Sequence, residues 1–502
     1  MALTEPPLRA QVPIITNQPS SRVVWAGCNV AFTVGVSGTG PFSYQWQFNG
    51  TNLSNNIIST VAGNGGNGYS GDGGPATNAT LGNIQTVSLD KSGNMYLPDG
   101  PLRVRKVDIS GIINTVAGGG TNGLGDGGPA TNASLGDPSH VAVDDRGNWY
   151  IPDLGNQRVR KVDTNGIIST VAGTGTNGFS GDGGPATNAN LAFPAGVALD
   201  ALKNLYIADD SNHRVRRVDT DGIISTFAGN GTNGYTGDGG LATNASLYSP
   251  YRLAFNPAGN LFLIDGYPRV RMIDTNGIIT TVAGNGTSGF SGDGGQATNA
   301  TLSSVRDLAA DADNNLFIAD TGSGRIRRVD ATGVITTVAG GGSDDLHDGI
   351  PATSAYLYTP YGVAVDVAGN LFIAELNGHK VRKVTNNRGP ILALNEVTVA
   401  SAGDYQVVVT GSGGSVTSSV ATLTVATSPL VSGVLRNSDG SVSLNFVSPP
   451  NSTNTVLVTT SLSAPVLWQP LATNPAGADG AWLYLDTSAS NFPARLYRSM
   501  RD

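Results

Sequence analysis

Residues 166–222 read GIISTVAGTGTNGFSGDGGPATNANLAFPAGVALDALKNLYIADDSNHRVRRVDTDG, and this stretch decides the fold because the chain repeats it. The first apolar residues of successive copies lie 55 or 56 residues apart, at Ile57, Ile112, Ile167, Ile223, Ile278 and Val334. A constant period of this size indicates an array of one supersecondary unit.

Each copy contains four short runs of strand type, separated by turn signals. In the quoted copy and the strand after it, the runs are 196–200, 205–209, 214–219 and 223–229. The pair Asp221-Gly222 supplies the residues with positive φ that a tight hairpin requires. No segment has sustained helical periodicity with caps. The sequence therefore predicts an all-β protein built on a six-bladed β-propeller with four-stranded blades.

The repeat core, P-x-G-V-A-V-D-x-x-G-N-L-Y-I-A-D-x-x-N-H-R-V-R-K-V, resembles the NHL repeat. The resemblance is clearest in Pro194–Val218 and Pro360–Val384 and extends over residues 56–387. It implies the propeller fold. It does not imply one function, because the family includes both enzymes and binding modules.

Two incomplete copies at the ends of the array predict how the ring closes. The sixth copy ends near Val384 with no outer strand after it, whereas Ile57–Gly63 is an outer strand with no inner strands before it. We expect Ile57–Gly63 to complete the last blade, because ring closure removes two open sheet edges. Residues near 56 and 387 would then lie side by side.

The segments that flank the array resemble the two halves of one immunoglobulin-like sandwich, formed by residues 13–55 and 388–426. Trp46 stands where such domains keep the strand-C tryptophan, and Tyr405 where they keep the tyrosine corner. Val34 and Val407 occupy the positions of the two inter-sheet cysteines. Packing of these valines around Trp46 is expected to replace the disulfide.

Two further segments complete the predicted domain organisation. Residues 427–502 contain alternating strand patterns and resemble a small fibronectin type III-like sandwich of secreted bacterial proteins, with an aromatic core expected from Trp468 and Phe492–Tyr497. Residues 1–12 are expected to form an N-terminal arm.

The composition excludes several classes of protein. A formal net charge of −8 argues against binding to nucleic acid, which requires a basic face. One cysteine, Cys28, excludes a disulfide framework within the chain. No run reaches the length of a membrane-spanning helix, and the first residues, MALTEPPLRAQVP, lack the apolar segment of a signal peptide. We expect a monomeric bacterial protein that is secreted or held at the cell surface.

The six inserted Gly-rich loops each carry an aspartate that could suggest calcium: Asp72, Asp126, Asp182, Asp238, Asp293 and Asp348. Calcium requires six to eight oxygens that converge on one point, whereas these residues are spread around a ring. Each aspartate is expected to accept backbone N–H groups of its own turn, and no cofactor or metal is expected. In the third strand of each blade, the first arginine, such as Arg158 or Arg214, is expected to pair with the preceding Asp153 or Asp209.

The candidate site lies where the copies differ, at the start of each inner strand. Inner strands line the channel of a propeller, so these side chains should surround its mouth on the side of the inserted loops, which we call the loop face. The candidate ligand-binding residues are Gln85, His140, Tyr251, Arg252, Arg306, Asp307 and Tyr361. A locally positive mouth would suit a carboxylate, a sulfate or an acidic sugar. The alternative is sequence drift at exposed positions.

Three functions remain open from the sequence. The first is a binding protein of the bacterial exterior that recognises a glycan or a protein on the loop face. The second is a lyase or hydrolase acting on an anionic sugar or lactone at the channel mouth, with catalytic candidates His140, Arg306, Asp307 and Tyr361. The third is a rigid spacer. NHL-type amidating lyases hold zinc with several histidines on inner strands, whereas only His140 has such a position here.

Overall fold

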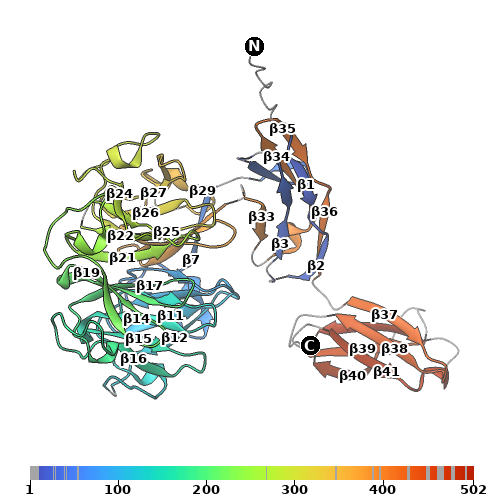
Figure 1. Ribbon diagram of the computed structural model, residues 1–502. Coiled ribbons are helices and arrows are strands. Elements are labelled where there is room, and N and C mark those ends of the chain that lie inside the picture. The colour runs from blue at the N-terminus through green and yellow to red at the C-terminus, as the bar shows by residue number, and fades with distance from the viewer. Residues whose placement is uncertain are drawn as a thin grey trace, which may run out of the picture. The chain divides into compact units, whose positions relative to one another are not determined.

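The computed structural model describes residues 11–501 apart from short gaps, and the chain divides into two compact units, Ser54–Gly389 and Met1–Leu53 with Pro390–Asp502. The gaps are residues 27, 29, 39, 41, 54–55, 122, 267, 345–346, 387–388, 395–396, 427–429, 448–452, 461–467, 476–480 and 492–494. Most of the expected N-terminal arm and the expected domain borders at 55, 388 and 427 lie outside the described residues. The described part of the chain is all-β and contains no α-helix (Figure 1).

The unit Ser54–Gly389 consists of six antiparallel sheets in its described residues. The first is β8 (Gly74–Pro75), β12 (Ile112–Gly118), β11 (Arg103–Val107), β10 (Met95–Asp99) and β9 (Ser88–Leu89). The second is β13 (Ala142–Val143), β14 (Trp149–Asp153), β15 (Arg158–Val162) and β16 (Ile168–Ala172). The third is β17 (Pro194–Leu199), β18 (Leu205–Asp209), β19 (Arg214–Val218) and β20 (Ile224–Ala228).

The other three sheets repeat this order. The fourth is β21 (Pro250–Phe255), β22 (Leu261–Asp265), β23 (Val270–Ile273) and β24 (Ile279–Ala283). The fifth is β25 (Val305–Ala310), β26 (Leu316–Asp320), β27 (Arg325–Val329) and β28 (Ile335–Gly340). The sixth is β29 (Ile350–Pro351), β7 (Ile57–Ala62), β32 (Lys380–Thr385), β31 (Leu371–Glu375) and β30 (Pro360–Val365).

Short 3₁₀ turns recur in the connections between these strands. One set lies in the inserted loops: η1 (Ala76–Asn78), η2 (Ala130–Asn132), η4 (Ala186–Asn188), η6 (Ala242–Asn244), η7 (Ala297–Asn299) and η9 (Ala352–Ser354). A second set joins the second and third strands of a sheet: η3 (Leu154–Asn156), η5 (Asp210–Asn212) and η8 (Thr321–Ser323).

Strand β7 joins the two ends of this unit. It pairs with β32 in the register Ile58↔Val384, in the sheet where the sequence places it. The Asn56 backbone N–H donates to the Thr385 carbonyl at 2.9 Å. The two points where the chain enters and leaves the unit therefore lie next to each other.

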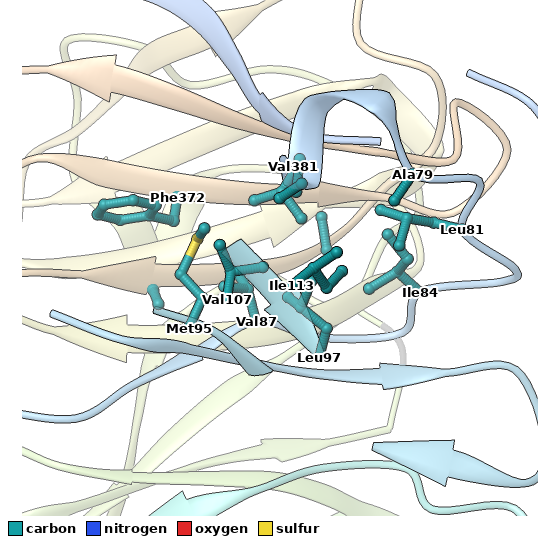
Figure 2. Close-up of a cluster of buried hydrophobic side chains, with 14 residues drawn as sticks. Ala79, Leu81, Ile84, Val87, Met95, Leu97, Val107, Ile113, Phe372 and Val381 are labelled. Carbon is teal, nitrogen blue, oxygen red and sulfur yellow. The ribbon is translucent and has the colours of Figure 1, made fainter. Parts of the chain in front are cut away.

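Hydrophobic clusters lie between successive sheets, and one of them joins the last sheet to the first. Figure 2 shows this cluster, in which Phe372 and Val381 of the sixth sheet pack with Met95, Val107 and Ile113 of the first. The first strands β9, β13, β17, β21, β25 and β30 also contact one another in sequence, and β30 contacts β9. The packing is therefore propeller-like.

The second unit brings strands from both ends of the chain into shared sheets (Figure 1). One sheet has the order β2 (Arg22–Trp25), β36 (Ala421–Ala426), β34 (Gly403–Gly411), β5 (Ser43–Phe48) and β6 (Thr51–Asn52), with β35 (Gly414–Thr417) on β34. The smaller pairs are β1 (Ile14–Asn17) with β4 (Gly35–Ser37), and β3 (Val30–Thr33) with β33 (Ile391–Leu394); η10 (Val399–Ser401) precedes β34.

Trp46 and Tyr405 lie in one buried cluster of these sheets, together with Val34 and Val407. Trp46 is opposite Val407 in the register of β5 and β34. The Tyr405 hydroxyl donates to the Ser401 carbonyl at 2.7 Å, which is the hydrogen bond of a tyrosine corner. Cys28 is a free, partly exposed cysteine.

The C-terminal segment forms two three-stranded sheets. They are β37 (Leu430–Arg436), β38 (Val442–Val447) and β41 (Ala481–Asp486), and β40 (Gln469–Pro475), β39 (Thr453–Thr459) and β42 (Leu496–Arg501), with η11 (Ala489–Asn491) before β42. Phe446 stacks on Trp482 in the core, with ring centroids 4.2 Å apart. The expectation that Trp468 belongs to this core is wrong, because it is only half-buried and the Arg498 guanidinium covers its ring at 4.5 Å. Phe492 lies outside the described residues.

A buried arginine ties each inserted loop to its sheet. In the third sheet, Arg216 is fully buried, and its guanidinium donates to Asp209 at 3.3 Å and to Asp182 at 2.6 Å. Asp182 also accepts from the Thr226 backbone N–H at 3.1 Å and from its hydroxyl at 2.6 Å. The arginines with this role are Arg105, Arg160, Arg216, Arg271, Arg327 and Arg382.

These contacts correct two expectations. The loop aspartates bind the arginine and threonine of the sheet instead of the N–H groups of their own turn. The partner of Asp209 is the second arginine, Arg216, and not Arg214, although Arg214 is its direct neighbour in the strand register. Positions two apart on a strand share one face, so the diagonal neighbour can reach the carboxylate, while Arg214 donates to the Asn212 and Asn230 carbonyls.

Replacing Arg216 by methionine should destabilise the unit by about 3–5 kcal/mol, because Asp209 is fully buried and would lose its cation. The measurement is urea unfolding followed by ¹⁹F NMR of 5-fluorotryptophan at Trp149, the tryptophan of this unit. The matched control, Arg214→Met on the same strand, should cost about 1 kcal/mol. Equal costs for the two variants would contradict the assigned roles.

Candidate functional site

The sequence-predicted site residues occupy the start of the inner strands, at two adjacent positions of each repeat. Tyr251, Arg306 and Tyr361 share the first position, and His140, Arg252 and Asp307 share the second. Tyr251 and Arg252 begin β21, Arg306 and Asp307 begin β25, and Tyr361 begins β30. The strand register shifts at these positions in all three strands, and the two positions have different surroundings.

Arg252 and Asp307 are buried, and both side chains form hydrogen bonds with backbone groups of this chain. The Arg252 guanidinium donates to the Ala195 carbonyl and, at 2.7 Å, to the Ser139 carbonyl, so it joins the second, third and fourth sheets. Its Nε lies 4.0 Å from the Asp307 carboxylate. Asp307 accepts the backbone N–H of Val363 at 3.0 Å and of Leu308 at 2.9 Å.

His140 has a similar structural contact. The Val197 backbone N–H, on the next sheet, donates to its Nδ1 at 3.5 Å, which places the ring proton on Nε2. The side chain is partly buried. Burial and the nearby Arg252 charge together lower the pKa of His140 to about 3. The imidazole is therefore neutral at pH 7 and a weak base.

Three partly exposed side chains form what we call the tyrosine–arginine cluster: Tyr251, Arg306 and Tyr361. The Arg306 guanidinium lies 5.2 Å from the centroid of the Tyr361 ring and 5.9 Å from that of Tyr251. The two hydroxyls are 3.5 Å apart. Burial and the neighbouring Tyr251 raise the pKa of Tyr361. The cluster thus combines a cation with two phenols, and the Arg252 guanidinium also lies 4.2 Å from the centroid of the Tyr251 ring.

The side chains of the remaining predicted residue and of the other histidines have contacts outside this cluster. The Gln85 side chain donates to Asp137 at 3.2 Å. His213 and His379 contact the backbone carbonyls of Tyr248 and Gly82, and His347 contacts Asp344. Within the described residues, no three His, Cys, Asp or Glu side chains are placed to hold a metal ion. In that same part of the chain, no helix is long and apolar enough to cross a membrane.

Sequence reasoning missed the backbone partners of the site. The Ser139 and Ala195 carbonyls that hold Arg252 belong to positions occupied by small residues, and a carbonyl leaves no signature in the side-chain pattern. The glycine at 196 gives a partial signal, because a Cβ there would lie 2.5 Å from the Tyr251 carbonyl. The sequence thus indicates that neighbouring inner strands lie close together, but it does not indicate that Arg252 binds carbonyls of the other sheets.

Asp307 should make stability depend on pH in the acidic range. Burial raises its pKa to about 6, and Arg252 and two backbone N–H groups offset only part of that increase. The folded state then binds a proton more readily than the unfolded state, so stability should fall as the pH rises from about 4 to 6. Relative to Asp307→Asn, the free energy of unfolding of the wild type should fall by on the order of 2–3 kcal/mol across this range. Urea unfolding at each pH measures this difference. A pH-independent difference between the two proteins would contradict the assignment.

The sequence comparisons with known proteins concern the unit Ser54–Gly389. The teneurin NHL domain family matches residues 61–124, 119–180, 174–235 and 231–289. Mouse Teneurin-1 is 30% identical over 280 residues, which cover 47% of this chain and 10% of the relative. Teneurin-m of Drosophila melanogaster is 31% identical over 229 residues, covering 41% of this chain and 8% of the relative. The match thus involves about a tenth of the length of these curated relatives.

A solved structure supports the fold. The crystal structure of an auxiliary nutrient binding protein from Bacteroides ovatus aligns with a TM-score of 0.51 at 14% identity, over 72% of this chain and 95% of that chain. At this identity the similarity concerns the fold alone. Residues 61–289 are therefore an NHL-repeat region similar to that of teneurins, within an all-β unit of propeller-like fold.

Proposed function

We propose that the protein is a binding protein of a bacterial exterior, secreted or held at the cell surface. We propose that its unit Ser54–Gly389 is a six-bladed propeller. Its ligand would be a glycan or protein segment that carries a carboxylate and binds at the tyrosine–arginine cluster on the loop face. Six sheets, with contacts between the last and the first, support the number of blades.

The observation that carries the proposal is the chemistry of the tyrosine–arginine cluster. Arg306 lies near two tyrosine rings that remain partly exposed. A guanidinium binds carboxylates with directional, charge-assisted hydrogen bonds, and tyrosine combines an aromatic face with a hydroxyl. Sites that orient a ligand typically combine apolar surface with a few placed polar groups.

The enzyme alternative has less support, because the groups it needs are already engaged. A general base requires a free acceptor and a pKa near the working pH, whereas His140 accepts the Val197 N–H and has a pKa of about 3. Asp307 accepts two backbone N–H groups and faces Arg252. Both side chains act as acceptors between or within the sheets.

The flanking domains suggest a modular surface protein. A hydrogen bond between Asn56 and Thr385 keeps the ends of the unit Ser54–Gly389 together, so an immunoglobulin-like domain could accept the propeller as an insertion in a surface loop. The pairing of β5 with β34 and the shared cluster of Trp46 and Tyr405 support this arrangement. The C-terminal sheets would form an accessory fibronectin type III-like sandwich.

The test is binding of the purified full chain to an array of acidic and neutral glycans and to an array of acidic peptides. Arg306→Gln and Tyr361→Ala should each weaken binding of the acidic ligand by at least tenfold, since a charge-assisted contact contributes about 1.5–3 kcal/mol. The matched control is Arg146→Gln, which removes the same charge from an exposed turn. No binding on either array, or equal losses in the control, would refute the proposal.

A further inference from the structure

Four inserted loops place an aromatic ring over the arginines of their own sheet. The rings are Tyr69, Phe179, Tyr235 and Phe290, each 3.8–4.0 Å from the guanidinium of the first arginine and 4.7–5.0 Å from that of the second. In the third sheet these arginines are Arg214 and Arg216. Each of these loops therefore places its own aromatic residue at a position where the arginines of its sheet can bind an aromatic ring.

The loop of the second sheet lacks this ring. Its sequence Gly123-Leu124-Gly125-Asp126 is one residue shorter than Gly178-Phe179-Ser180-Gly181-Asp182 of the third sheet. The Leu124 carbonyl accepts from Arg160 at 2.5 Å, as the Ser180 carbonyl accepts from Arg216 at 3.0 Å. Leu124 therefore replaces the serine, and Gly123 stands in the place of the aromatic residue.

The groups that would hold a ring are nevertheless in place. Arg158 donates to the Asn156 and Thr174 carbonyls, as Arg214 donates to the Asn212 and Asn230 carbonyls beneath Phe179. Backbone acceptors on both sides thus hold the Arg158 guanidinium as they hold that of Arg214. The buried Nε of Arg160 has no hydrogen-bond partner among the described residues, whereas the Nε of Arg216 donates to Asp182 at 3.1 Å.

A depression open to solvent occupies this place in the second sheet. Its volume is about 430 Å³, within the usual range for small-ligand sites of about 300–1,000 Å³. The lining residues include Leu124, Asp126, Arg158, Thr170 and Thr174. The hollow therefore combines an apolar wall, a guanidinium face and two oxygen acceptors.

The acceptors match a phenol. In the first sheet, the Tyr69 hydroxyl contacts Asp72 at 2.8 Å and Thr115 at 2.9 Å. The corresponding residues of the second sheet, Asp126 and Thr170, are bonded to each other at 2.8 Å and both line the depression. A tyrosine ring stacked on Arg158 could thus place its hydroxyl next to the same two groups.

We propose that this depression is a docking site for a tyrosine side chain presented by a loop of a partner protein. The partner would supply the ring that four other loops of this chain supply internally. The guanidinium of Arg158 would bind its face, and Asp126 would accept a hydrogen bond from its hydroxyl. This site is separate from the tyrosine–arginine cluster, and its test does not depend on the proposed function.

The probe is the peptide acetyl-Gly-Tyr-Ser-Gly-amide, which copies Gly68–Gly71, titrated into the deuterated, ¹⁵N-labelled full chain. We expect saturable shifts of the amides of residues 123–127 and Thr170, and no comparable shifts at residues 178–184. Arg158→Gln should weaken binding about two- to fivefold, the expected effect of losing an exposed cation–π contact. The peptide with alanine in place of tyrosine should not bind.

Two variants serve as matched controls. Replacing residues 119–128 by the sequence of residues 174–184, which brings its own phenylalanine, should abolish the shifts. Phe179→Ala should open a second site, with new shifts at residues 178–184, and this ring is exposed enough (42%) for its removal to be tolerated.

Absence of saturable shifts, or shifts that persist after the loop replacement, would overturn the proposal. Binding of free 4-methylphenol without binding of the peptide would overturn the assignment to a partner protein, because it would indicate a site for small phenols. Peptide binding that is lost in the loop replacement and doubled in stoichiometry by Phe179→Ala would support it.

Discussion

The structure of the unit Ser54–Gly389 depends on a buried guanidinium that bridges two carboxylates in each sheet. Arg216 shows the pattern, with one carboxylate fully buried at Asp209 and the other partly exposed at Asp182. Burial raises the pKa of Asp209 to about 6 even though Arg216 and several hydrogen-bond donors favour its charged form. An ion pair of this kind contributes little net stability compared with apolar packing, but removing one partner is costly. Its main effect is to fix the long inserted loop on the sheet.

The same constraint explains why repetition need not mean repeated function. In five of the six sheets a further arginine lies two residues before the arginine that holds the loop, while the sixth sheet has Lys380 at this position. Four loops cover that first arginine with an aromatic ring, while the loop at 119–128 is shorter and leaves Arg158 next to an open depression. A deletion of one residue in a repeat can thus create a binding feature without changing the sheet beneath it.

At the start of the inner strands, the polar residues divide into two groups by their contacts. Arg252, His140 and Asp307 cross-link sheets or bind backbone groups, whereas Arg306 remains partly exposed between two tyrosines. Charged groups that are buried require partners, so they are the least available to a ligand. The partly exposed side chains of the tyrosine–arginine cluster are therefore the ones on which a function can be built.

The sequence by itself determined the all-β class, the period and the position of the closing strand, because these depend on hydrophobic alternation and turn residues along the chain. The runs at 205–209 and 214–219, for example, match β18 and β19 to within one residue. It also identified the variable positions of the inner strands. Only the tertiary structure decided which of those side chains are buried, and that Arg216 instead of Arg214 binds Asp209. Those outcomes depend on diagonal neighbours and on carbonyls from other sheets, which no pattern of residue types encodes.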